Sequence, residues 1–273
     1  MVKAFISDID ETILPAGEKY ASKEVEAELL GLQEDGIVLI LATARILAGV
    51  EKLMQQFQME KYGGYVVSSN GSYIYDCKNK QCLYQTTIPM EMIQQLYEFS
   101  VEHELHMSSE LHEYNVISGY DAAIEFDWKA VGVNFYLPAG SYLDAVKEEP
   151  FKAAFTYDKE RLAKVLPIVE EKFGPHLTVQ LSQELYIDMV PYGVTKASGI
   201  QQILELLNLH SDEVAAIGDG NNDIPMLQLA GITAVVENAS NHIKAHANTI
   251  VSSCEEHGVA EFARIIKSRN SLK

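Results

Sequence analysis

The stretch VKAFISDIDE at residues 2–11 decides the fold. Residues 2–6 are apolar or aromatic apart from Lys3, and the run ends abruptly in polar residues. Such a short apolar run indicates a strand that is buried on both faces of a sheet. Asp8 and Asp10 follow it directly, at the carboxyl end of the predicted strand. Ligands of open α/β sheets bind at that end, so these two carboxylates are candidate functional residues.

Helices and strands alternate on both sides of this motif. Ser22 can cap a helix with an apolar stripe, Gly36 can close it, and a second buried run follows at residues 37–42. A third short strand is predicted at residues 65–68, and another at residues 214–217 near the end of the chain. This alternation predicts a parallel sheet covered by helices.

The middle of the chain has a different pattern, in which helical stretches accompany short alternating strands. We therefore predict an α/β fold: a Rossmann-like parallel-sheet core formed by residues 1–82 and 188–273, interrupted by an inserted α+β domain at residues 83–187. Aromatic residues of this insertion are expected in its own hydrophobic core; they include Phe126, Trp128, Phe135 and Tyr136.

Composition excludes several classes of protein. The chain has 273 residues, 47% of them hydrophobic, which is enough to bury one large core or two smaller ones. The formal charge of -18 argues against nucleic acid as a partner, because nucleic-acid affinity depends on clustered Lys and Arg. The absence of a long apolar run or a leader pattern favours a cytoplasmic protein without a membrane partner. Nothing in the sequence indicates an oligomeric state.

Three further motifs could complete a site with Asp8 and Asp10. Thr43 follows the second strand with a hydroxyl suited to a phosphate oxygen, and Lys196 opens a helix whose free N–H groups could also face an anion. Residues 218–223, GDGNND, follow a buried strand and offer carboxylates and amides as hard oxygen ligands for Mg²⁺. Two acidic groups and two phosphate-binding groups together predict magnesium-assisted phosphoryl transfer.

The ordered motifs DIDET (8–12), ATAR (42–45), GVTK (193–196) and GDGNNDIPM (218–226) closely resemble the four motifs of the haloacid dehalogenase superfamily. The large insertion between the second and third motifs resembles the type IIB cap of the Cof-like sugar-phosphatase group. The resemblance covers the core almost end to end, whereas in the cap it rests on position and element order.

The resemblance implies a phosphatase that acts on a small phosphorylated metabolite with Mg²⁺ as cofactor. It makes Asp8 the nucleophile that becomes an aspartyl-phosphate, and Asp10 the general acid and base, with a backbone carbonyl that binds the metal. The implied metal ligands are Asp8, Asp10, Asp219 and Asp223, and the implied phosphate-binding residues are Thr43, Ala44, Lys196 and Asn222.

Three positions depart from the pattern of this family, which usually has glycine where this chain has Glu11, Ala44 and Ala197. Each added Cβ could narrow the pocket or shift a loop. Two alternatives therefore stay open beside a phosphatase of sugar, nucleotide, flavin or pyridoxal phosphates: a phosphosugar mutase, and a phosphometabolite-binding protein that has lost turnover.

Overall fold

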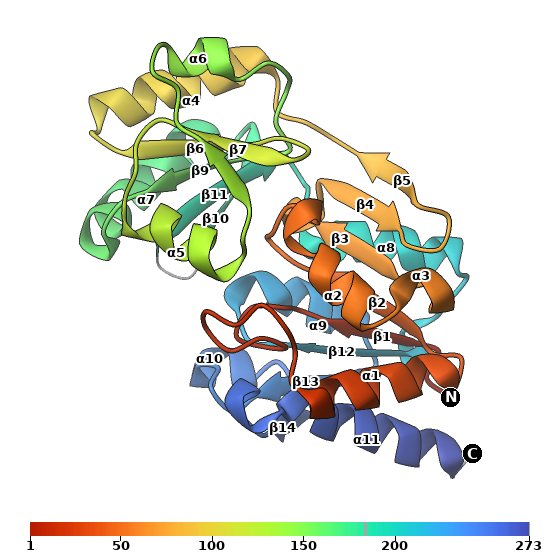
Figure 1. The fold of residues 1–273 in the computed structure, drawn as a ribbon. Coiled ribbons are helices and arrows are strands. Elements are labelled where there is room, and N and C mark those ends of the chain that lie inside the picture. Colours follow the sequence, from red (N-terminus) through yellow and green to blue (C-terminus); the bar gives the residue numbers. More distant parts are fainter. Residues whose placement is uncertain (183–184, 273) are drawn as a thin grey trace.

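The computed structural model describes residues 1–182 and 185–272. Two separate sheets organise the chain (Figure 1). The first sheet has the strand order β14-β13-β12-β1-β2-β3-β4-β5 and is parallel from β14 to β3. Its strands are β1 (Ala4–Ser7), β2 (Val38–Ala42), β3 (Tyr65–Ser68), β4 (Tyr73–Asp76), β5 (Gln81–Gln85), β12 (Val214–Gly218), β13 (Ile232–Val236) and β14 (Thr249–Val251).

Helices cover the first sheet, as the alternation predicts. Helices α1 (Lys23–Glu34) and α11 (Gly258–Ser271) pack side by side, and α8 (Lys196–Leu206) packs with α9 (Ile224–Leu229) elsewhere along the sheet (Figure 1). Shorter helices complete this part: α2 (Glu51–Gln56), α3 (Met59–Tyr62) and α10 (Asn241–Lys244), with the 3-10 turns η1 (Leu47–Gly49), η2 (Ser69–Gly71), η3 (Ser211–Glu213), η4 (Asn221–Asp223) and η5 (Cys254–Glu256).

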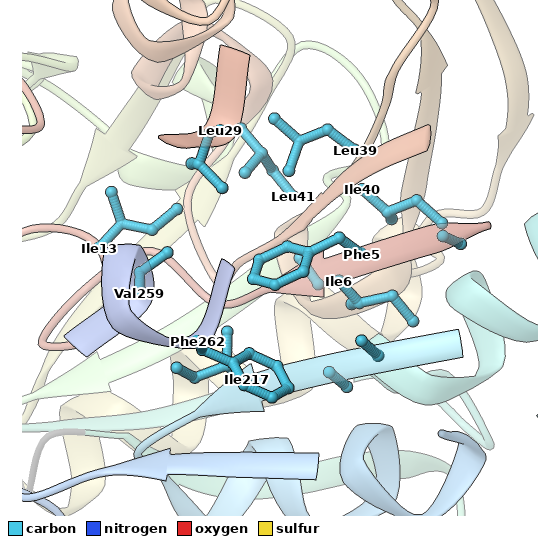
Figure 2. Packing of buried hydrophobic residues seen from close by; sticks show 14 of the residues in the cluster. Phe5, Ile6, Ile13, Leu29, Leu39, Ile40, Leu41, Ile217, Val259 and Phe262 are labelled. Atoms are coloured by element: carbon cyan, nitrogen blue, oxygen red, sulfur yellow. The ribbon is translucent and has the colours of Figure 1, made fainter. Parts of the chain in front are cut away.

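Local chemistry explains where these elements begin and how they pack. The Ser22 hydroxyl accepts a hydrogen bond from the backbone N–H of Val25, which caps α1 as predicted. In the core between α11 and the sheet, the rings of Phe5 and Phe262 lie 5.4 Å apart between centroids, and both are fully buried (Figure 2). Burial of such aromatic side chains is a major part of the free energy that holds the layers together.

The second sheet is built entirely from the middle of the chain and has the order β10-β11-β9-β6-β7-β8. Its strands are β6 (His106–Glu110), β7 (Tyr114–Ile117), β8 (Asn134–Tyr136), β9 (Lys152–Thr156), β10 (Leu177–Ser182) and β11 (Tyr186–Pro191). Helices α4 (Met90–Glu102) and α7 (Lys159–Phe173) pack on it, and α5 (Ala122–Ala130) and α6 (Tyr142–Ala145) lie in its connections.

Successive residues of these strands point to opposite faces, so the second sheet has an apolar face and a polar face. Phe155 is buried with Phe99 and Phe173 of the covering helices, whereas Lys152 and Ala154 of the same strand line a cavity on the other side. The parallel-sheet core and the α+β character of the middle segment are thereby confirmed.

The predicted domain limits at 82/83 and 187/188 fall inside two strands. Strand β5 continues the first sheet to Gln85, and β11 belongs to the second sheet as far as Pro191. Limits that follow the sheets would lie just after these two residues, and we propose them in place of the sequence-based ones. No helix in the described part of the chain is long and apolar enough to cross a bilayer.

Candidate active site

Three of the predicted motifs lie together at one edge of the first sheet. Asp8, Thr43 and Asp219 each follow directly on one of three neighbouring parallel strands, β1, β2 and β12. The carboxyl ends of parallel strands meet at the same edge, which brings together residues that are more than 200 positions apart in the sequence.

Lys196 joins this group from the first turn of α8. Thr195 caps the helix, and its side chain accepts a hydrogen bond from the backbone N–H of Ser198. The buried Lys196 ammonium donates to Asp8 Oδ1 at 2.5 Å and to Asp223 Oδ1 at 2.8 Å. Burial alone would lower the pKa of Lys196, but the attraction of Asp223 and Asp8 outweighs it and raises the pKa above its usual value. Lys196 is therefore a fixed positive charge beside Asp8.

Asp8, Asp219 and Asp223 form a group of carboxylates that could hold a metal ion. One oxygen from each lies within 4.8 Å of the others. Burial raises the pKa of Asp8 to about 7, with a further contribution from Asp223, while Lys196 opposes the shift. Burial, Asp8 and Asp223 also raise the pKa of Asp219 well above its usual value. Crowded carboxylates of this kind suit a hard divalent cation such as Mg²⁺, which binds oxygen ligands and offsets their repulsion.

The loop after β12 is held in place by its own acidic residues. Asp223 Oδ2 accepts hydrogen bonds from the backbone N–H groups of Asp219 and Gly220, at 3.1 and 3.0 Å. The hydroxyl of Thr12 donates to Asp219 Oδ1 at 2.8 Å and so links this loop to the loop after β1. Both carboxylates are thus oriented before any metal or substrate binds.

Asp10 lies beside the group and is bound by an arginine. Arg45 Nε donates to Asp10 Oδ2 at 2.9 Å, and its Nη2 donates to Asp10 Oδ1 at 2.5 Å. This two-point contact fixes the plane of the carboxyl group. The side chain of Arg45 is only 6% exposed, whereas that of Asp10 is 30% exposed and reaches the cavity. Arg45 is the last residue of the motif ATAR (42–45), but the sequence does not predict its contact with Asp10.

The remaining predicted phosphate-binding residues differ in their surroundings. Ala44 and Asn222 line the cavity, whereas Thr43 is not among the described residues that line it. Thr43 is fully buried, and its hydroxyl accepts a hydrogen bond from the backbone N–H of Arg45. Thr43 therefore shapes the turn that carries Arg45 and Ala44. The roles implied by the motifs for all these residues stay predictions.

Only one of the three positions that lack the usual glycine has a backbone that favours glycine. Glu11 has φ = 59°, whereas Ala44 and Ala197 are not among the described residues with positive φ. Its side chain also lines the cavity, and burial, Asp10 and Glu255 raise its pKa. Glu11 thus places both backbone strain and an acidic group beside Asp10.

A cavity of about 350 Å³ lies between the two sheets and contains Asp8, Asp10 and Asp219 in its wall. The middle segment contributes the opposite wall. Here the expectation for the aromatic residues was wrong: Trp128 and Tyr136 are 54% and 51% exposed, and Phe126 and Phe135 line the cavity instead of packing in the hydrophobic core. Helical or strand spacing shows that a face is apolar, but it does not show whether a core or a cavity covers that face.

A second polar cluster, which we call the cap cluster, consists of Glu110, Lys152 and Asp188 on the polar face of the second sheet. Lys152 Nζ lies 3.2 Å from Glu110 Oε2 and 3.6 Å from Asp188 Oδ1, and it donates to the backbone carbonyl of Ala44 at 2.7 Å. Asp188 also accepts a hydrogen bond from Asn70 of the first sheet's η2 turn at 3.1 Å. The cap cluster thus connects the two walls of the cavity.

Sequence reasoning missed the cap cluster. Its members come from the adjacent strands β6, β9 and β11, so only strand pairing brings them together. Asp188 stands in the stretch YIDMVP (186–191), which resembles the family but predicted no role for Asp188, and Glu110 and Lys152 have no motif around them.

Comparisons with known proteins agree with the fold and the motifs. The model of the haloacid dehalogenase-like hydrolase family matches residues 5–262. A haloacid dehalogenase-like hydrolase from Bacteroides thetaiotaomicron has a similar structure, with a TM-score of 0.89 and 26% identity over 97% of this chain and 100% of that one. A haloacid dehalogenase subclass IIB sugar phosphatase shares the fold at a TM-score of 0.83 and 21% identity, over 97% of this chain and 99% of that one.

Sequence relatives extend over nearly the whole chain. The pyridoxal phosphate phosphatase of Escherichia coli is 25% identical over 270 residues, which cover 93% of this chain and 95% of the relative. Phosphatases among full-length relatives support the class of enzyme that the motifs predict. The family match spans nearly all of the chain and includes each of the four motifs. The chain therefore belongs to the haloacid dehalogenase-like hydrolases.

Proposed function

We propose that this phosphatase is a magnesium-dependent phosphomonoesterase that transfers the phosphoryl group of a small phosphorylated metabolite to Asp8 and then to water. The observation that carries the proposal is the surroundings of Asp8. Its carboxylate lies in the wall of the cavity, contacts the buried ammonium of Lys196, and has an oxygen within 4.8 Å of an oxygen of Asp219 and of Asp223. This combination suits a nucleophile that must approach a phosphate dianion.

The acidic group fits Mg²⁺ by its chemistry. Asp8, Asp219 and Asp223 supply carboxylate oxygens close enough to share one ion, and the family motif adds the backbone carbonyl of Asp10. When bound, Mg²⁺ supplies positive charge that reduces the repulsion between these carboxylates and the phosphoryl oxygens. The raised pKa values of Asp8 and Asp219 support a cation at this position, because burial first and repulsion by neighbouring carboxylates second disfavour their charged forms, and a bound cation would offset both effects.

In the proposed first step, a carboxylate oxygen of Asp8 attacks phosphorus, and the bond between phosphorus and the leaving oxygen breaks. Asp10 donates a proton to that oxygen, and the alcohol leaves. In the second step Asp10 takes a proton from water as the water oxygen attacks the aspartyl-phosphate, which releases phosphate and restores Asp8. Arg45 keeps the Asp10 carboxyl group oriented for both transfers.

Lys196 is placed to act on the phosphoryl oxygens during the same steps. It cannot move far, because Asp223 holds it on one side and α8 on the other. A fixed cation of this kind stabilises developing negative charge at little cost in reorganisation. A protein that only binds phosphorylated metabolites has no need of a nucleophile. The presence of Asp8 in contact with Lys196 therefore favours an enzyme over the binding-protein alternative.

The test is magnesium-dependent phosphate release by the purified protein from sugar phosphates, nucleotides, flavin and pyridoxal phosphates. Asp8→Asn should abolish release, while Asp35→Asn, an exposed change of the same kind at the end of α1, should leave it unchanged. Mass spectrometry of the wild type quenched during turnover should find phosphate on the peptide that contains Asp8. Near-normal steady-state turnover by Asp8→Asn would exclude the proposed mechanism.

A further inference from the structure

The end of the cavity formed by the second sheet has its own chemistry, apart from the phosphoryl-transfer residues. Its polar wall comes from neighbouring strands, and an apolar wall from α5, β8 and the segment between them faces the same space. The polar residues are Ser108, Glu110, Asn115, Lys152, Ser182 and Asp188.

The charges in this wall leave no positive group for a second anion. Among the described residues that line the cavity, three are basic: Arg45, Lys152 and Lys196. The structure pairs Arg45 with Asp10 and Lys196 with Asp8 and Asp223. Lys152 is held by the other two members of the cap cluster and by a backbone carbonyl.

The two carboxyl groups of the cap cluster are buried and well hydrogen-bonded. Glu110 is 2% exposed and accepts a short hydrogen bond from Ser69, and Asp188 is 3% exposed and accepts hydrogen bonds from Ser182 at 2.7 Å and Asn70 at 3.1 Å. Burial raises the pKa of Glu110, and Lys152 and Ser69 oppose the shift. Even a neutral Glu110 leaves Asp188 to neutralise Lys152, so the cap cluster carries no net positive charge in either state.

One polar group in this wall lacks a partner. The side-chain oxygen of Asn115 is buried and has no hydrogen bond with any residue that the structure describes. Since a buried acceptor without a partner costs free energy, this oxygen favours a ligand that brings an O–H or N–H donor. The apolar wall opposite, which includes Ile124, Val133 and Phe135, suits a nonpolar face of the same ligand.

We propose that this end of the cavity selects phosphomonoesters whose leaving alcohol is uncharged, carries a hydroxyl or amide N–H donor for Asn115, and has a nonpolar face for the apolar wall, and that the cap cluster rejects those with a second phosphate or a carboxylate. This inference rests on the proposed phosphatase function and names the substrate class of the same site. A second anion at this end would be desolvated beside Glu110 and Asp188 without a free cation to compensate it. The selection also argues against a mutase that needs a bisphosphate activator.

The experiment uses substrates that differ by one group. We would compare kcat/KM for 4-(hydroxymethyl)phenyl phosphate with that for 4-carboxyphenyl phosphate, and for glucose 6-phosphate with that for glucose 1,6-bisphosphate. For the wild type, kcat/KM should be at least tenfold higher for the uncharged member of each pair. Equal or faster hydrolysis of the anionic members would overturn the proposal without any variant.

Variants then identify the residues responsible. The near-isosteric double change Glu110→Gln with Asp188→Asn removes the two negative charges that face Lys152 in the cap cluster, and should shift the ratio toward the anionic member at least tenfold. The control is Glu102→Gln with Asp35→Asn, which removes two exposed carboxylates away from the cavity and should leave the ratio unchanged. An unchanged ratio in a folded double variant would also overturn the proposal; the single changes serve if the double variant does not fold.

Binding separates failure of this inference from failure of the proposed function. The Asp8→Asn protein with Mg²⁺ should bind 4-(hydroxymethyl)phenyl phosphate more tightly than both the carboxylate and the 4-methylphenyl analogue, as measured by titration calorimetry. Asn115→Ala should remove the preference over the methyl analogue. The binding preference tests the selection even if no ester is hydrolysed, whereas absence of Asp8-dependent turnover bears on the phosphatase proposal alone.

Discussion

Asp219→Asn should stabilise the protein in the absence of divalent metal. Asp219 shares a 4.8 Å group with Asp8 and Asp223 but, unlike them, makes no hydrogen bond with Lys196 in the described structure. Its contact with the Thr12 hydroxyl survives the change, because the asparagine Oδ1 can accept the same hydrogen bond. The substitution therefore removes a repelled charge and keeps the shape of the site.

The magnitude follows from the spacing of the charges. Two unit charges about 5 Å apart interact by roughly 3 kcal/mol at an effective dielectric constant of about 20. Asp219 is half-buried, and Lys196 offsets part of the negative charge nearby, so about 1 to 2 kcal/mol remains. For a chain of this size that corresponds to a rise in Tm of roughly 2 to 8 °C.

The dependence on pH has a definite sign. The folded-state pKa of Asp8 is raised to about 7 and that of Asp219 is raised as well, so the folded protein binds more protons than the unfolded chain from about pH 4 up to the folded-state pKa of Asp8. The stability that these groups contribute is fully present below the unfolded-state pKa and is lost as the pH rises through the folded-state value. The metal-free wild type should therefore lose stability across this window, and Asp219→Asn should lose less.

The assay is thermal unfolding of the wild type, Asp219→Asn and the control Asp35→Asn, with chelator and with Mg²⁺, at pH 5 and pH 8. Mg²⁺ at ten times its Kd should stabilise the wild type by about 1.4 kcal/mol and the variant by clearly less. If Asp219→Asn melts below the wild type in chelator and gains as much from Mg²⁺ as the wild type does, the reasoning about charge crowding in this site is wrong.

Three further changes test the neighbouring contacts. Arg45→Gln removes the two-point contact with Asp10 and should lower kcat at least about tenfold, with a smaller effect on KM, in steady-state phosphate release. Gly49→Val should raise KM at least about tenfold with little change in Tm, because a Cβ at Gly49 would lie 2.7 Å from Val131, which lines the cavity, and would displace that wall. Glu11→Gly should lower KM for phosphate esters a few-fold and change Tm by less than about 2 °C, since loss of a strained φ offsets the added freedom of the unfolded chain.

The phosphoryl-transfer half of the site could be predicted from sequence because its positions obey a rule of topology. A short buried strand is visible as an apolar run, and the residues that follow parallel strands meet at one edge of the sheet. Asp8 and Lys196 are 188 residues apart, yet each carries the local signal of a strand end or a helix start. These local signals predict that Asp8 and Lys196 lie close together without any knowledge of side-chain contacts.

The cap cluster could not be predicted in the same way. Its three charged residues come together through the antiparallel pairing of β9 with both β6 and β11, where Lys152 lies opposite Glu110 and Ala154 lies opposite Asp188. That register is set by the turns and by packing of the whole middle segment, and a shift of one residue would turn each side chain to the other face. From the sequence alone, a single charged residue in such a strand cannot be distinguished from a charged residue that is exposed to solvent.

The missing glycines show how structure can separate positions that sequence treats alike. Ala44 and Ala197 accept a Cβ without a positive φ, so the glycine usual at those positions is not demanded by this backbone. Glu11 does hold a positive φ, and the side chain of Asn238 donates to its backbone carbonyl at 2.9 Å, so a neighbouring loop supports the strained turn. A non-glycine residue in this region costs on the order of 1 kcal/mol. Glu11 therefore adds backbone strain and an acidic side chain to the loop that carries Asp8 and Asp10, the two proposed catalytic residues. Of the three departures from glycine, Glu11 is the one that bears on turnover.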